Sequence, residues 1–251
     1  FYSRSIVNPS VAAKLLQQGK KSRLFLLNAL DQNSPYLVGG EDRSYMGEGG
    51  QSLVNVLRYQ HLSSPVSRFG AVMTNRFYDG GGYGHLFGFD GLFLLNKNWR
   101  LSFEVFKNVN REPVQDWITT DAAIQGQSIA LDGDHINGDA LYLQLYRKTE
   151  HWQSYFYFRN ISPQYRADVG FAVKTNRRWG TLFHEYINIL NKPAIQAYGF
   201  GTKIDVVYTF EDIHKNLSID FFASLKTIWQ TEHKYTLDFD AFKTFLGIAF
   251  T

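Results

Sequence analysis

Residues 138–162 alternate between apolar and polar side chains along two adjacent runs, separated by a polar break at 149–151. A period of two over two runs joined by a short turn predicts an antiparallel β-hairpin. One face of this hairpin would be aromatic and polar. The other face would be purely apolar, with the side chains of Leu141, Leu143, Leu145, Phe156 and Phe158.

The same alternation recurs along most of the chain and predicts about 12–14 strands in all. Most are roughly 9–13 residues long, the length with which a tilted strand crosses a bilayer. Strands of soluble sandwiches are usually about 5–6 residues long. Besides the hairpin, strands are predicted at 1–7, 11–18, 22–31, 52–62, 66–78, 86–95, 99–109, 168–175, 179–189, 195–210, 217–229 and 235–250.

The predicted connections are of two kinds that alternate along the chain. Short turns lie at 19–21, 63–65, 96–98, 149–151 and 176–178. Longer loops lie at 32–50, 79–84 and 110–137. Short turns at one end and long loops at the other are typical of outer-membrane barrels.

The predicted fold class is therefore all-β, an antiparallel up-and-down transmembrane β-barrel formed by a single domain over 1–251. Whether the chain is a fragment of a larger barrel stays open at this point. The mean hydropathy of -0.27 does not conflict with a barrel. In a barrel strand the polar residues on one face offset the apolar residues on the other face in the average. No apolar run of about 18 residues is present, which excludes a transmembrane helix. The alternative is a soluble β-sandwich binding module with Leu and Phe inside.

Composition removes several functional classes. The chain has no cysteine, which excludes disulfides, thiolate zinc sites and cysteine nucleophiles and suits an oxidising periplasm. The net charge is +3 and no Lys/Arg block is present, so no nucleic-acid partner is expected. No signal peptide precedes Phe1, which predicts a mature or trimmed chain.

Three stretches, at 1–7, 161–178 and 217–235, resemble the β-barrel of a Bacteroidota outer-membrane family of unknown function. In that family the barrel usually follows a family-9-like carbohydrate-binding domain. Arg4-Ser5-Ile6 departs from the Arg-Ile-Gly of the family, and the carbohydrate-binding domain is absent from the chain. The resemblance implies a bacterial outer-membrane location and no catalytic residues.

On the barrel interpretation, the polar parity faces the lumen. Tyrosine beside polar groups favours sugar binding, because its ring has an apolar face and a hydrogen-bonding tip. The expected partners are outer-membrane lipid and lipopolysaccharide, the barrel-assembly machinery and a glycan, with no cofactor. The lumen-facing candidates are Glu104, Tyr142, Gln144, Tyr146, Tyr155, Tyr157, Arg159, Asp205, Asp220 and Lys226.

Metal sites and membrane anchors have weaker signals. Asp132, Asp134 and Asp139 form an oxygen-rich loop of the kind that holds Ca²⁺, but their spacing misses the EF-hand pattern. His184-Glu185 lacks the second histidine of a zinc motif, so no metal site is predicted. Aromatic residues at strand ends predict interfacial girdles; these are Tyr59, Tyr78, Trp99, Trp152, Trp179 and Trp229.

The predicted function is non-enzymatic: a channel, or the membrane platform of a glycan-recognition or uptake protein. The enzymatic alternative is an outer-membrane hydrolase of the phospholipase kind. It would need a serine and a histidine within hydrogen-bond reach. Ser154 and His151 supply the residue types, but nothing in their sequence context marks them.

Overall fold

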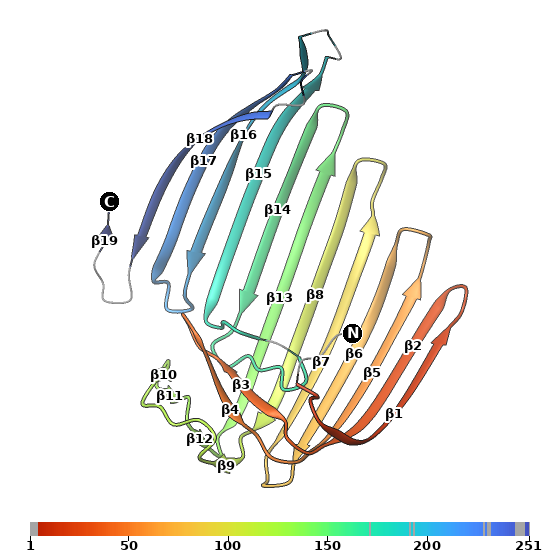
Figure 1. Cartoon of the computed structure of the whole chain (residues 1–251), viewed down its shortest axis with the longest axis vertical. Coiled ribbons are helices and arrows are strands. Elements are labelled where there is room, and N and C mark those ends of the chain that lie inside the picture. Colours follow the sequence, from red (N-terminus) through yellow and green to blue (C-terminus); the bar gives the residue numbers. More distant parts are fainter. Residues whose placement is uncertain are drawn as a thin grey trace. The chain divides into compact units, whose positions relative to one another are not determined.

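The computed structural model describes residues 5–170, 172–190, 192, 194–227, 229, 232–243 and 249–250. Within these ranges the chain is all-β, and neighbours in sequence are neighbours in one large antiparallel up-and-down sheet (Figure 1). No helix in the described part of the chain is long and apolar enough to cross a membrane. The sheet contains, in order, β1 (Pro9–Gln18), β2 (Ser22–Asp31), β5 (Ser52–Leu62), β6 (Arg68–Tyr78), β7 (Tyr83–Leu94), β8 (Trp99–Arg111), β13 (His135–Lys148), β14 (Trp152–Ile161), β15 (Arg177–Ile189), β16 (Ile195–Tyr208), β17 (His214–Thr227), β18 (Glu232–Lys243) and β19 (Ala249–Phe250).

The predicted all-β, up-and-down architecture is confirmed, and β2 and β5 have the predicted bounds. Closure into a barrel is not shown, because the strand order ends at β1 and β19 and no pairing joins them among the described residues. Residues 1–4 of the first predicted strand lie outside the described residues, and 5–7 are not a strand.

The strand predicted at 168–175 is wrong. This segment contains a turn, in which Gly170 N donates to Ala167 O, and its extended contact is a single parallel bridge between Gly40 and Lys174. Val169 of this segment packs against Val54 and Val56 of β5, and a local pattern cannot distinguish such packing from pairing in a sheet.

Two predicted loops contain short hairpins instead of irregular chain. Residues 32–50 form β3 (Pro35–Gly39) and β4 (Ser44–Glu48), which pair with each other. The 110–137 segment holds β9 (Val114–Gln115), β10 (Ala123–Ile124), β11 (Gln127–Ser128) and β12 (Leu131–Asp132), paired as β9 with β12 and β10 with β11.

The chain divides into two compact units, which we describe separately. Unit 1 comprises Phe1–Leu92, Phe103–Leu141 and Asn160–Arg177. Unit 2 comprises Phe93–Ser102, Tyr142–Arg159 and Arg178–Thr251. Strands β7, β8, β13 and β14 and the first residue of β15 therefore divide between the two units.

Strand register separates two chemically different faces. In unit 1, Leu53 and Phe77 are opposite each other on the face that we call the outer face, whereas Val54 and Arg76 share the inner face. In unit 2, Leu182, Ile204 and Ile219 follow one another across the outer face. Phe183, Lys203 and Asp220 do so on the inner face. The leucines of β13 lie on the outer face. Tyr142, which alternates with them along the strand, contacts Arg159 on the inner face.

The outer face of unit 1 has one polar row within its apolar surface. Asn28, Asn55, Asn75 and His85 follow one another in register across β2, β5, β6 and β7. Asn55 Nδ2 donates to Asn28 Oδ1 at 2.6 Å, and His85 Nδ1 lies 2.8 Å from Asn75 Oδ1. These side chains bond to one another, which lowers the cost of placing them on an apolar surface.

Candidate functional site

The inner face of unit 2 brings together most of the predicted lumen-facing residues. Asp205 and Asp220 have this parity by register, and Tyr155 joins them through its contact with Phe183. Glu104 falls in unit 1 and is exposed. The remaining predicted residues of unit 2 on this parity are Tyr142, Gln144, Tyr146, Tyr157, Arg159 and Lys226.

Three aromatic rings form a stack across this face. The rings of Tyr155 and Phe183 are 4.8 Å apart and inclined by 9°, and those of Phe183 and Phe222 are 5.7 Å apart and inclined by 17°. Gly201 lies between Phe222 and β15, and a Cβ there would lie 2.7 Å from the Phe222 ring. The glycine therefore gives Phe222 the space to lie flat over β16.

A second aromatic cluster surrounds Arg159. Its guanidinium lies 4.9 Å from the ring centre of Tyr142, 5.3 Å from Tyr157 and 5.4 Å from Trp179. Arg159 Nε also donates to the Tyr157 hydroxyl at 2.8 Å. Cation–π contacts of this kind hold a charged side chain and several rings in one fixed surface.

Asp205 fixes the side chains between these two clusters. Its carboxylate accepts hydrogen bonds from Trp179 Nε1 at 3.1 Å and from Thr181 Oγ1, and it forms an ion pair with Lys203. A carboxylate with three partners has little capacity for a ligand. Asp205 therefore positions Trp179 and Lys203, and the residues around it offer the binding groups.

Unit 1 presents a different arrangement, because loops cover its inner face. The loops at 32–50 and 110–137 pack into a hydrophobic core of their own, which also contains the inner-face residue Tyr78. We call β3–β4, residues 112–134 and residues 162–176 together the cap. Its buried core residues are Tyr36, Val38, Ile118, Ile129 and Leu131.

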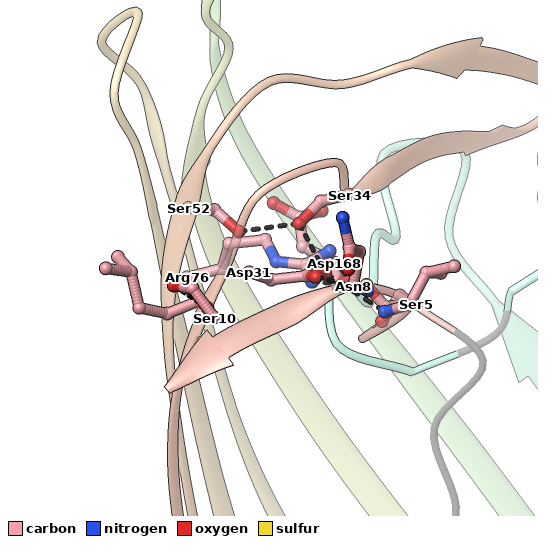
Figure 2. A network of polar contacts seen from close by, with 10 residues as sticks. Ser5, Asn8, Ser10, Asp31, Ser34, Ser52, Arg76 and Asp168 are labelled. Carbon is pink, nitrogen blue, oxygen red and sulfur yellow. Dashed lines mark hydrogen bonds and ion pairs between the residues drawn. The ribbon is translucent and has the colours of Figure 1, made fainter. Parts of the chain in front are cut away.

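A buried polar cluster joins the cap to the sheet (Figure 2). Arg76 on β6 is fully buried; its Nη1 donates to Asp168 O at 2.8 Å and its Nη2 to Ser5 O at 2.5 Å. The same guanidinium lies 3.9 Å from the carboxylate of Asp31, which is also fully buried. Asp31 in turn accepts hydrogen bonds from Asn8 N at 2.7 Å and from the Ser34 hydroxyl at 2.9 Å.

A second ion pair, between Arg166 and Glu112, lies within the cap. Arg166 N also donates to Asn108 Oδ1 at 3.1 Å, and its Nη1 donates to the Tyr36 hydroxyl at 3.4 Å. Burial raises the pKa of the Glu112 carboxyl, and the nearby Arg166 guanidinium opposes this shift without cancelling it.

The raised pKa predicts that the cap is more stable in mild acid. When the cap is closed, Glu112 holds its proton above the ordinary pKa of 4.5, whereas an opened cap exposes the carboxyl to water. The stabilisation is therefore complete below 4.5 and is lost as the pH rises through the raised pKa. Hydrogen exchange of β3–β4 amides, corrected for the intrinsic rate, should show stronger protection at about pH 5 than at about pH 7. Glu112→Gln should weaken this dependence, and stronger protection at the higher pH would contradict it.

Sequence reasoning missed Phe183, Trp179 and Lys203 on the inner face and Arg76 and Asp31 beneath the cap. Alternate residues along a strand lie on the same face, and the first three lie on the same face as residues that were predicted. Counting every second residue along each strand would therefore have found them. Arg76 and Asp31 lie at the ends of predicted strands, and no local pattern indicates that a loop covers them.

The candidate calcium ligands are not brought together. Among the residues that the structure describes, no group of three or more His, Cys, Asp or Glu side chains is placed to hold a metal ion. Asp132 lies in β12, opposite Val114. The backbone of Asp139 instead bonds to Ser162, with Ser162 N donating to Asp139 O at 2.9 Å.

The serine of the predicted hydrolase pair contacts a different histidine. Ser154 Oγ lies 2.7 Å from His184 Nδ1, and the ring of Trp152 stacks on His184 at 4.6 Å. His151 Nδ1 lies 3.3 Å from the carbonyl of Ile187 instead. In a catalytic triad the histidine turns Nε2 to the serine and Nδ1 to the orienting carboxylate. His184 instead turns Nδ1 to Ser154, so the two residues do not have the arrangement of a triad.

The predicted aromatic girdle is corrected at two positions. Tyr78 is buried in the cap core, and Trp179 belongs to the inner face. Trp99 is the first residue of β8, and the Arg147 guanidinium lies 5.8 Å from its ring centre.

Comparisons of the chain with protein-family models, with curated proteins and with solved structures found no match.

Proposed function

We propose that the chain is an outer-membrane β-barrel without enzymatic activity, serving as the membrane platform of a glycan-recognition or uptake protein. Its outer face would contact lipid and lipopolysaccharide. Its inner face would be the wet side, with the aromatic and polar groups of unit 2 available to a glycan. The barrel-assembly machinery would insert it.

The distribution of burial carries this proposal. On the inner face, Arg76 and Asn108 are fully buried although they are polar. On the outer face, large apolar side chains are bare: Phe87 is 45% exposed, Phe89 63% and Leu182 47%. Extended exposed apolar surfaces mark contact with a membrane or a partner, and here the surface follows one face from strand to strand.

A soluble sandwich fits this distribution poorly. A sandwich covers the apolar face of one sheet with a second sheet. Here the described residues contain one large sheet, and the chain folds its own loops over the polar face. Val54 and Val56 of β5 pack against Val169 of the cap, on the face that carries Arg76.

The cap favours a plugged platform over a wide channel. Its buried core, its own ion pair and the buried ion pair of Arg76 with Asp31 beneath it lie on the inner face of unit 1. A water-filled pore would instead leave the lumen side chains solvated. We therefore expect little current through the protein when the cap is in place.

The enzymatic alternative is a hydrolase acting on lipid or glycan, but the hydrogen bond between Ser154 and His184 on the outer face is made through Nδ1 and disfavours a triad there. Lipid hydrolysis should be assayed with and without Ca²⁺. Turnover that Ser154→Ala abolishes would establish the hydrolase, and no turnover in either condition would remove it.

The membrane proposal predicts three properties of the purified protein. It should be extracted only with detergent, because the bare apolar face requires amphiphile. It should migrate differently in gels before and after heating, as folded barrels do. Reconstituted in planar bilayers, it should show little conductance if the cap is closed. Quantitative recovery as a soluble monomer without detergent would contradict the proposal.

A further inference from the structure

A hollow on the inner face of unit 2 has the features of a ligand site. It has a volume of about 310 Å³ and is lined by residues of β15, β16, β17 and β18. This volume lies at the lower end of the range of about 300–1,000 Å³ for small-molecule sites. The residues that define its chemistry are Phe183, Phe222, Glu185, Asp220, Lys203 and Lys234.

Two glycines of β16 let side chains that line the hollow lie close over the sheet. Gly201 is opposite Glu185 on one side and Phe222 on the other, and Gly199 is opposite Ser224. A Cβ at Gly199 would lie 3.0 Å from the Ser224 hydroxyl. Because neither glycine has a side chain, the Phe222 ring and the Ser224 hydroxyl occupy the space above β16, and both residues line the hollow.

The groups around the hollow balance in charge. Lys203 and Lys234 supply ammonium donors, and Glu185 and Asp220 supply carboxylate acceptors. Lys234 Nζ lies 5.3 Å from the ring centre of Phe222, so one donor stands over the aromatic platform. A ligand matched to these groups presents an apolar face to the ring and several hydroxyls to the rim, with no net charge.

We propose that this hollow binds one end of a neutral, linear oligosaccharide that runs along the strands to the Arg159 cluster. A pyranose ring would enter beside Lys234 with its apolar face against Phe222, and its hydroxyls would bond to Asp220 and Lys203. Trp179 and Phe183 are four residues apart on β15, which corresponds to about 13 Å. A monosaccharide reaches only one of the two aromatic clusters, whereas a longer chain reaches both. The inference rests on the proposed function, since it takes the inner face as the wet side.

The test is binding of neutral β-linked and α-linked glucose oligomers, from one to six units, to the full chain folded in detergent. Affinity should rise with chain length, and galacturonate oligomers of equal length should bind more weakly. Phe222→Leu should lower the affinity roughly five- to tenfold by removing the platform. Phe221→Leu is the matched control, because Phe221 is the adjacent residue on the outer face, and it should bind as the parent does.

The outcomes separate this inference from the proposed function. A protein that folds in detergent with heat-modifiable migration but binds no neutral oligomer overturns the inference alone. Tighter binding of galacturonate oligomers, or equal losses in the two leucine variants, also overturns it. Recovery as a soluble monomer without detergent overturns the proposed function as well.

Discussion

Phe221→Arg should block assembly of the protein into the outer membrane. Phe221 lies on the outer face, 50% exposed, between Thr202 and Leu237 in register. An arginine on the lipid face costs about 2–4 kcal/mol near the middle of a bilayer. The measurement is the fraction of heat-modifiable protein in outer-membrane preparations, and we expect that fraction to fall strongly.

The adjacent Asp220→Asn is the control for this variant. Asp220 points to the inner face, so losing its charge leaves the outer face unchanged. We expect it to assemble as the parent does. Equal assembly of both variants would show that the outer face meets water, since an arginine is harmless on a solvated surface. That result would contradict the assigned orientation of the sheet.

Arg76→Met should release the cap. The substitution removes the guanidinium from between Asp31, Asp168 O and Ser5 O and leaves the Asp31 carboxylate buried without its cation. Removing one partner of a buried ion pair costs about 3–5 kcal/mol. We expect faster hydrogen exchange in β3–β4 and a measurable rise in planar-bilayer conductance.

Arg58→Met is the matched control for Arg76→Met. Arg58 also has the inner parity and forms an ion pair with Asp90, but its side chain is 23% exposed and lies outside the cap. Losing a partly exposed pair should cost about 1 kcal/mol or less. If both variants loosen the cap equally, Arg76 is not the residue that holds it.

The strands could be predicted from the sequence because alternation is a local property. The alternation along residues 217–227 predicts that Asp220 and Phe221 lie on opposite faces of the sheet. The structure places these two side chains on opposite faces. The bounds of β2 and β5 were also predictable, because Gly, Pro and Ser clusters stand at their ends.

The cap could not be predicted, because its contacts join residues far apart in sequence. Arg76 and Asp168 are 92 residues apart, and Arg166 and Tyr36 are 130 apart. The aromatic stack has the same origin. The parity of Phe183 was accessible, but its stacking on Phe222 depends on Gly201 in the strand between them. Such contacts are properties of the assembled sheet.

Strand β1 has one consequence for the insertion into a bilayer that the proposed function requires. It pairs with β2 on one side and is exposed along its whole length, and no described strand pairs with its other side. Roughly every second residue of an antiparallel edge turns its N–H and C=O away from the neighbour. In hydrocarbon each unsatisfied group costs several kcal/mol. Under the proposed function, insertion would therefore favour chains in which β1 has acquired a second neighbour, because lipid penalises an incomplete sheet.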